Sequence, residues 1–210
     1  MNLTVLKLML ALGIAGHAIN MYCDRILSIF PNGKLTLKSM DTLKDGRKLA
    51  KLMEGVSENV PMRSAILGAF SLVLQFLGYF SISAYIYERS TVYGTILFLT
   101  ITLFIVVGTA HHVKYALGEY VFLKLGRDAR AHSLMMAFYD SAPITKICYL
   151  SYIVFIITLI AAIVTGTAAF PIWAAIFTIL PIFIILFPLQ IIGTLHIAAM
   201  TSMLVWLFLI

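Results

Sequence analysis

Six long apolar runs with almost no charged residues restrict what this chain can fold into more than any other feature of the sequence. They occupy about residues 3–22, 62–87, 92–114, 147–167, 170–186 and 188–210. A helix that crosses a bilayer needs roughly 20 consecutive apolar residues. Charged residues make up 11% of the chain, against about 25% in soluble domains. We therefore predict an all-α, polytopic membrane protein with six transmembrane helices, folded as a single membrane domain over residues 1–210.

Lysine and arginine are distributed very unevenly between the connections of these runs. Thirteen of the fifteen lie in or beside residues 23–61 and 114–146, and only Lys7 and Arg89 remain for the opposite side. Cytoplasmic loops of membrane proteins carry an excess of these residue types. The sequence thus predicts that loop 23–61 is cytoplasmic and that both termini lie outside. Because this topology explains the net charge of +6, the predicted partner is the lipid bilayer and not a nucleic acid.

The cytoplasmic loop 23–61 contains two local signals. Phe30-Pro31-Asn32-Gly33 predicts a chain reversal, because proline presets a negative φ and Asn-Gly tolerates a positive one. From Met40 to Val56, apolar residues recur near helical spacing opposite a basic face, which predicts a short amphipathic helix. Such a helix either lies on the anionic inner leaflet or packs on the loop that follows the third run. A second amphipathic segment is predicted at residues 129–139.

Ionisable residues inside membrane spans are costly and usually face the interior of the bundle, so the few in this chain are candidate site residues. One face of the first run combines a histidine, an asparagine and an aspartate at helical spacing. At a rise of about 1.5 Å per residue, all four histidines of the runs come to lie in the cytoplasmic leaflet. We predict a pocket there that binds a small amphipathic or lipid ligand, lined by His17, Asn20, Asp24, His111, His112, Glu119 and His196.

A bound metal ion is an alternative explanation for these histidines. Catalytic zinc takes three protein ligands and keeps one position open for water. His17 and His196, together with His112 or its neighbour His111, form such a set, and Asp24 either orients one of these ligands or acts as general base. This arrangement predicts a metal-dependent hydrolase that acts on a lipid amide or ester inside the membrane. No H-E-x-x-H motif supports it. The plainer interpretation is that the histidines form hydrogen bonds between helices.

Two further functions are compatible with six helices. The chain has the size of a substrate-binding subunit of a vitamin transporter, and Ala11 and Ala15 form a small-residue face on which another helix can dock. Such subunits keep both termini in the cytoplasm, which the distribution of lysine and arginine disfavours. A non-enzymatic partner of another membrane protein leaves no distinctive pattern in the sequence, and the oligomeric state stays open.

Several local patterns are spread over most of the chain. They are Asp24 at the end of the first run, Glu58-Asn59-Val60-Pro61, Gly78, Gly108-Thr109-Ala110-His111, Gly166, Phe170-Pro171-Ile172-Trp173, Phe177 and Pro181. Together they resemble an uncharacterised bacterial family of six-helix integral membrane proteins, a domain of unknown function. The chain departs from the family pattern at Cys23, Ile172 and His196, and His17 has no counterpart in it. The resemblance implies six helices in a bacterial inner membrane and no particular reaction.

Overall fold

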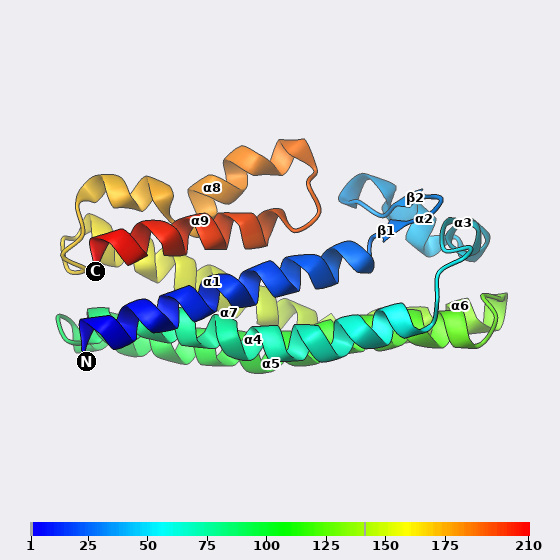
Figure 1. Cartoon of the computed structure of the whole chain (residues 1–210), viewed down its shortest axis with the longest axis horizontal. Coiled ribbons are helices and arrows are strands. Elements are labelled where there is room, and N and C mark those ends of the chain that lie inside the picture. Colours follow the sequence, from blue (N-terminus) through cyan, green and yellow to red (C-terminus); the bar gives the residue numbers. More distant parts are fainter. Residues whose placement is uncertain (1, 141) are drawn as a thin grey trace.

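The computed structural model describes residues 2–140 and 142–210, and its architecture is almost entirely helical (Figure 1). Helices that follow each other in the chain also pack side by side, and they alternate in direction along the bundle. The predicted all-helical class is confirmed, and four helices are long and apolar enough to cross a membrane. These are α1 (Leu3–Ile26), α4 (Asn59–Tyr87), α5 (Thr91–Lys124) and α7 (Ala142–Val164).

Large apolar side chains cover the outside of this bundle. Ile66 on α4, Val106 on α5 and Leu150 on α7 are 65%, 65% and 63% exposed. Soluble monomers rarely expose contiguous apolar surface on this scale, whereas such a surface matches the hydrocarbon core of a bilayer. The fold therefore presents its apolar surface as a membrane protein does.

The last fifth of the chain differs from the predicted fifth and sixth helices. The run 170–186 is divided into the 3₁₀ helix η2 (Ile172–Phe177) and α8 (Ile179–Leu186), and η3 (Phe187–Leu189) leads towards α9 (Thr194–Leu209). With 8 and 16 residues, α8 and α9 are about 12 and 24 Å long, less than the ~30 Å of a bilayer core. Among the described residues, six continuous spanning helices are therefore not present.

Proline explains much of this interruption. Pro171 directly precedes η2 and Pro188 lies within η3, and proline cannot donate the backbone hydrogen bond that a continuous helix needs. Gln190 and Gly193 then take left-handed backbone angles, with φ of 50° and 85°. Pro188, Gln190 and Gly193 thus separate α8 from α9, whereas the break between η2 and α8 falls at Thr178.

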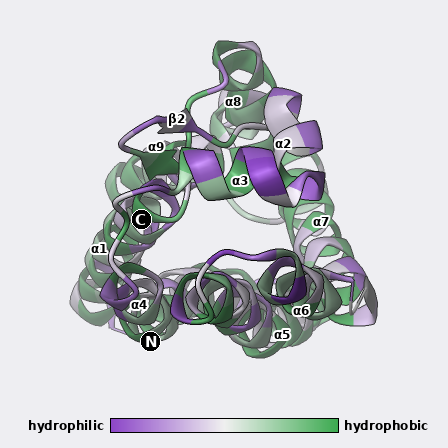
Figure 2. Ribbon diagram, turned by 90° about the vertical axis from the view of Figure 1, so that its right-hand side faces the viewer, coloured by the Kyte–Doolittle hydropathy of each residue, from purple (hydrophilic) through white to green (hydrophobic). Residues whose placement is uncertain are grey.

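One end of the bundle carries the segments rich in lysine and arginine, and we call it the basic end. It is formed by the hairpin of β1 (Ile29–Phe30) and β2 (Gly33–Lys34), by η1 (Leu37–Ser39), α2 (Met40–Lys44) and α3 (Gly46–Leu52), and by α6 (Ala129–Tyr139). Figure 2 looks at this end and shows hydrophilic residues on α2 and α3. Both termini lie at the opposite end (Figure 1).

The predicted features of loop 23–61 are resolved as follows. Phe30 pairs with Gly33, which confirms the chain reversal. The predicted amphipathic helix is divided into α2 and α3 at Asp45, whose side chain accepts hydrogen bonds from the first backbone N–H groups of α3. Buried Leu49 and Met53 pack in one cluster with residues of α5 and α6. The apolar side of this segment thus packs on protein, which was the second of the two predicted alternatives.

Candidate functional site

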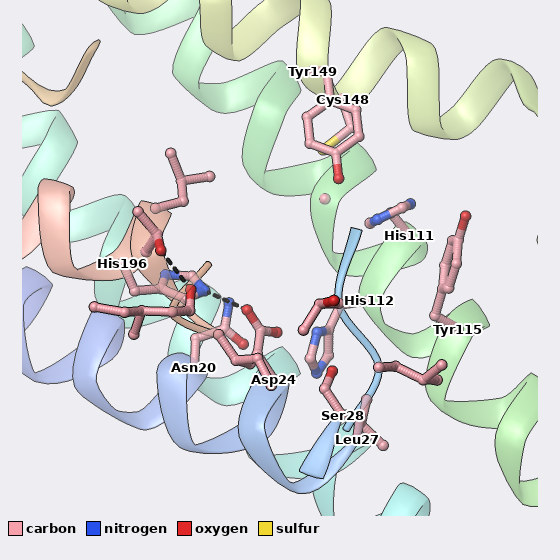
Figure 3. Close-up of a pocket in the computed structure, with 18 of the residues that line it drawn as sticks. Asn20, Asp24, Leu27, Ser28, His111, His112, Tyr115, Cys148, Tyr149 and His196 are labelled. Atoms are coloured by element: carbon pink, nitrogen blue, oxygen red, sulfur yellow. Dashed lines mark hydrogen bonds and ion pairs between the residues drawn. The ribbon is translucent and has the colours of Figure 1, made fainter. Parts of the chain in front are cut away.

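A cavity of about 590 Å³ lies between the bundle and the segments of the basic end. Its walls come from α1, α5 and α7, from the β1–α2 region, and from residues 187–196 at the junction of α8 and α9. The volume falls within the roughly 300–1,000 Å³ that small-molecule pockets occupy. Figure 3 shows how polar side chains from several helices converge on this space.

Three side chains from α1 and α9 are joined in a row by hydrogen bonds. Nε2 of His196 lies 3.1 Å from Oδ2 of Asp24, and its Nδ1 lies 2.9 Å from Nδ1 of His17. With an ionised carboxylate and two neutral rings, His196 donates to Asp24 and accepts from His17. His17 is buried and its free Nε2 has no hydrogen-bond partner, while its ring meets the edge of Tyr79.

His196 reaches this position because α9 begins partway along the bundle, beside α1 (Figure 1). The junction that precedes it approaches α1 so closely that a Cβ atom at Gly193 would lie 2.6 Å from Cγ of Met21. The irregular residues 190–193 line the cavity. Backbone without helical hydrogen bonds is tolerated at membrane depth only where it is buried in protein or lines a cavity. The cavity beside residues 190–193 therefore allows the helix to be interrupted there.

His112 is fixed against α4. Its Nε2 lies 3.1 Å from the backbone oxygen of Ser64 and 3.3 Å from the hydroxyl of the same residue. A carbonyl oxygen can only accept, so Nε2 of His112 carries the hydrogen. Gly68 makes the contact possible, since a Cβ atom there would lie 2.0 Å from Nε2 of His112.

His111 faces α7 instead. Its Nδ1 lies 3.0 Å from the hydroxyl of Thr145, and its ring packs against Tyr115 and Tyr149. The two adjacent histidines therefore connect α5 to different helices and both line the cavity. Their roles follow from the helical geometry, because consecutive residues on a helix point in directions about 100° apart.

Glu119 and Asn20 bring polar atoms that no group of the described residues satisfies. Glu119 is buried, and Tyr139 donates a 3.4 Å hydrogen bond to its Oε1 while Oε2 has no partner. Burial, with a smaller contribution from Glu119, raises the pKa of the Tyr139 hydroxyl well above its usual value, so this hydroxyl remains a donor. Oδ1 of Asn20 is also buried and unpaired. Buried polar atoms normally have a partner, so both atoms call for a polar partner in the cavity.

The structure brings most of the predicted pocket residues together. His17 does not line the cavity but lies behind His196, as its hydrogen-bond partner. Six of the seven predicted residues line the cavity itself: Asn20, Asp24, His111, His112, Glu119 and His196.

The predicted zinc ligands are not grouped in this way. His17 and His196 contact each other directly, whereas His112 is held at Ser64. Across residues 2–140 and 142–210, no group of three or more His, Cys, Asp or Glu side chains is arranged to hold a metal ion. The zinc site stays a prediction that this geometry does not support.

Sequence reasoning missed several residues of the site. Ser64, Thr145 and Tyr149 fix the two histidines of α5, and the irregular segment 190–193 forms one wall. Isolated hydroxyl and phenol groups in apolar runs give no signal of their own. A signal did exist for the wall, because hydrophobic runs interrupted by proline and glycine often mark binding sites in membrane proteins.

Comparison with known proteins adds one match. A family model described as a family of unknown function (DUF6796) matches residues 1–209. Neither a curated protein nor a solved structure is detectably similar to the chain.

Proposed function

The chain belongs to this family of unknown function, and from the geometry of its cavity we propose that it binds a small amphipathic or lipid ligand within the membrane. The observation that carries the proposal is the cavity of about 590 Å³ in which unpaired polar atoms of Asn20 and Glu119 stand beside apolar walls. Pockets for small molecules combine a mostly apolar lining with a few convergent polar groups. An amphipathic ligand satisfies both parts of this lining.

The proposal includes a location and a topology. We infer a bacterial inner membrane, with the basic end in the cytoplasm and both termini outside, because lysine and arginine gather at that end. The chain crosses the membrane six times, with the interrupted segment 172–189 as the fifth pass and α9 as the sixth. Discontinuous passes of this kind are typical of binding sites near the middle of a membrane. The cavity then lies in the cytoplasmic leaflet.

Cysteine labelling tests the topology. Cys23 and Cys148 are buried, so they give little background with a membrane-impermeant maleimide. We expect Arg89→Cys to be labelled in intact spheroplasts and Glu54→Cys only after the membrane is opened. Labelling of Glu54→Cys in intact spheroplasts contradicts the proposed orientation.

Native mass spectrometry tests ligand binding. Protein extracted from bacterial membranes in a mild detergent is expected to carry a co-purifying adduct, released at high collision energy. Gly108 lines the cavity, so Gly108→Phe fills it, and the adduct should be lost. Val106→Phe on the exposed side of the same helix is the matched control. A bare protein mass for the wild type, or an adduct that survives in Gly108→Phe, argues against the proposal.

A further inference from the structure

The cavity lining differs from the chain as a whole in its acidic and basic residues. The chain has fifteen Lys and Arg residues against nine Asp and Glu, yet within the described part of the chain the lining contains Asp24 and Glu119 and neither lysine nor arginine. The neighbouring Lys114 extends over the ring of Tyr115, with Nζ 4.9 Å from its centre. An anionic headgroup would thus meet two acidic side chains in the cavity and no basic partner.

The histidines of the lining do not reverse this charge. His112 donates from Nε2 to the oxygen of Ser64, and His196 donates from Nε2 to Asp24. Neutral rings make both of these bonds. A second proton on either ring would place a charge inside the membrane, where charges are costly. As neutral rings the histidines leave Asp24 as the charge that a ligand meets first, because the buried carboxyl group of Glu119 is subject to the same cost and becomes charged only when a cation lies beside it.

Unpaired acceptors in the cavity define what the ligand must supply. Asn20 and Glu119 are only 6% and 7% exposed, and Oδ1 of the first and Oε2 of the second have no hydrogen-bond partner. The carboxylate of Asp24 bonds to His196 through Oδ2, and its side chain remains 38% exposed. Ionised carboxylates and amide oxygens accept hydrogen bonds. The site therefore requires a ligand group with several N–H or O–H donors.

Aromatic rings favour a cation among such groups. Tyr115, Tyr139 and Tyr149 line the cavity. Tyr115 already stacks on Tyr139, with ring centres 4.3 Å apart, and carries Nζ of Lys114 over its ring. The rings left for a ligand cation are therefore those of Tyr139 and Tyr149. The face of an aromatic ring attracts a cation, with a larger gain where water is excluded. A protonated amine offers both a positive charge and up to three donors, whereas an alcohol offers one donor and no charge.

We propose that this cavity selects amphiphiles whose headgroup is a protonated amine, held by Asp24, Asn20 and Glu119. The inference rests on the proposed binding function of the same cavity and specifies its ligand class. The alkyl part of the ligand lies against apolar lining residues such as Leu72, Phe104 and Phe183. A primary ammonium fits the unpaired acceptors, because its three N–H groups can reach several oxygens at once.

Three amphiphiles with the same twelve-carbon tail test the selectivity. Dodecylamine, dodecanol and dodecyl sulfate are titrated below their micellar concentrations into protein held in phosphatidylcholine nanodiscs, and native mass spectrometry counts the bound molecules. We expect dodecylamine to bind at least about tenfold more tightly than the other two, a difference equivalent to roughly 1.4 kcal/mol. Equal or tighter binding of dodecanol or dodecyl sulfate overturns the inference.

Variants separate this selectivity from general effects of charge. Asp24→Asn is expected to weaken dodecylamine binding about tenfold and to leave dodecanol unchanged. Asp41→Asn removes one negative charge from an exposed position of α2 and serves as the matched control. If Asp24→Asn fails to fold, as judged by circular dichroism and gel filtration, Glu119→Gln provides the same test. Unchanged dodecylamine binding in the folded variant overturns the inference.

The two proposals fail in different ways. If the wild type binds none of the three amphiphiles more tightly than the cavity-filled Gly108→Phe does, the cavity is not a binding site and the proposed function is wrong. If all three bind to the wild type with similar affinity and are lost in Gly108→Phe, the binding function stands and only the preference for an amine is wrong.

Discussion

Nδ1 of His17 lies 2.9 Å from Nδ1 of His196, although 179 positions separate the two residues in the chain. This contact joins the first helix to the last and holds the wall formed by residues 190–193 against α1. His196 continues the contact to Asp24 on the same first helix. The contacts that join α1 to α9 therefore also position Asp24 and His196 in the wall of the cavity.

A double-mutant cycle measures this coupling. We expect His17→Phe and His196→Phe each to destabilise the protein, and the two changes together to cost less than their sum. The interaction energy should be about 0.6–1.7 kcal/mol, the range for hydrogen bonds between membrane helices. Unfolding by sodium dodecyl sulfate followed by circular dichroism gives the four stabilities. Additivity within a few tenths of a kcal/mol would show that the contact contributes no stability.

The contact of α1 with α4 depends on two glycines. A Cβ atom at Gly13 would lie 2.6 Å from Cα of Gly78, so Gly13→Ala forces the two helices apart. We expect a loss of about 1–3 kcal/mol in the free energy of unfolding. Gly108→Ala is the matched helical control, because its Cβ atom would meet Sγ of Cys148 at an ordinary 3.5 Å. Thermal unfolding in detergent compares the two variants, and equal melting temperatures would contradict the close approach.

Tyr79 and Tyr152 share a hydrogen bond of 2.6 Å between their hydroxyl groups in the interior of the bundle. Tyr79→Phe leaves the hydroxyl of Tyr152 buried without this partner, which costs about 1–3 kcal/mol. We expect the double variant Tyr79→Phe/Tyr152→Phe to be more stable than either single variant, since no hydroxyl then remains unpaired. Chemical unfolding of the three variants checks the order, and a double variant weaker than both single ones would refute it.

Asp45 makes the start of α3 sensitive to pH. Hydrogen bonds from the backbone N–H groups of Lys48 and Arg47 lower the pKa of its carboxyl group. Because the pKa is lower in the folded state, the stabilisation is present above the ordinary aspartate value of about 3.9 and is lost as the pH falls through the folded value. We expect hydrogen exchange of the α3 amides to lose protection in this acidic range.

Two variants control this measurement. Asp45→Ala should lose the protection of α3 already at neutral pH, because alanine has no acceptor for the N–H groups. Asp45→Asn keeps an acceptor without a titrating proton, so its protection should not change with pH. Acid-sensitive protection in Asp45→Asn would assign the effect to another group.

Much of the fold followed from the sequence. The apolar runs of α1, α4, α5 and α7 are long and uninterrupted, so a bilayer leaves them few alternatives to helix. The turn at Phe30–Gly33 followed from local backbone preferences, which do not depend on distant contacts. The fifth run, 170–186, forms η2 and α8 instead of one continuous helix, a division that its high hydropathy did not indicate.

The site was predictable to a smaller extent. Polar and ionisable residues are so costly within a membrane that their positions in the apolar runs indicated six of the residues that line the cavity. Their pairing was not predictable, because Ser64 and Thr145 have no pattern that identifies them as partners of His112 and His111. Whether three of these residues could hold a metal ion was not predictable either, because it depends on the directions of their side chains; in the described residues no such group is present.

The sequence by itself determined that this chain forms apolar helices and that its basic segments gather at one end, since both properties depend on the transfer of residues between water and lipid. Only the tertiary structure decided that α9 starts partway along the bundle and that Asp24, His196 and His17 form one chain of contacts. Those features require helices whose backbones approach each other closely where they cross, as α1 and α4 do at Gly13 and Gly78. Close packing between distant segments, and not hydropathy, sets these crossings.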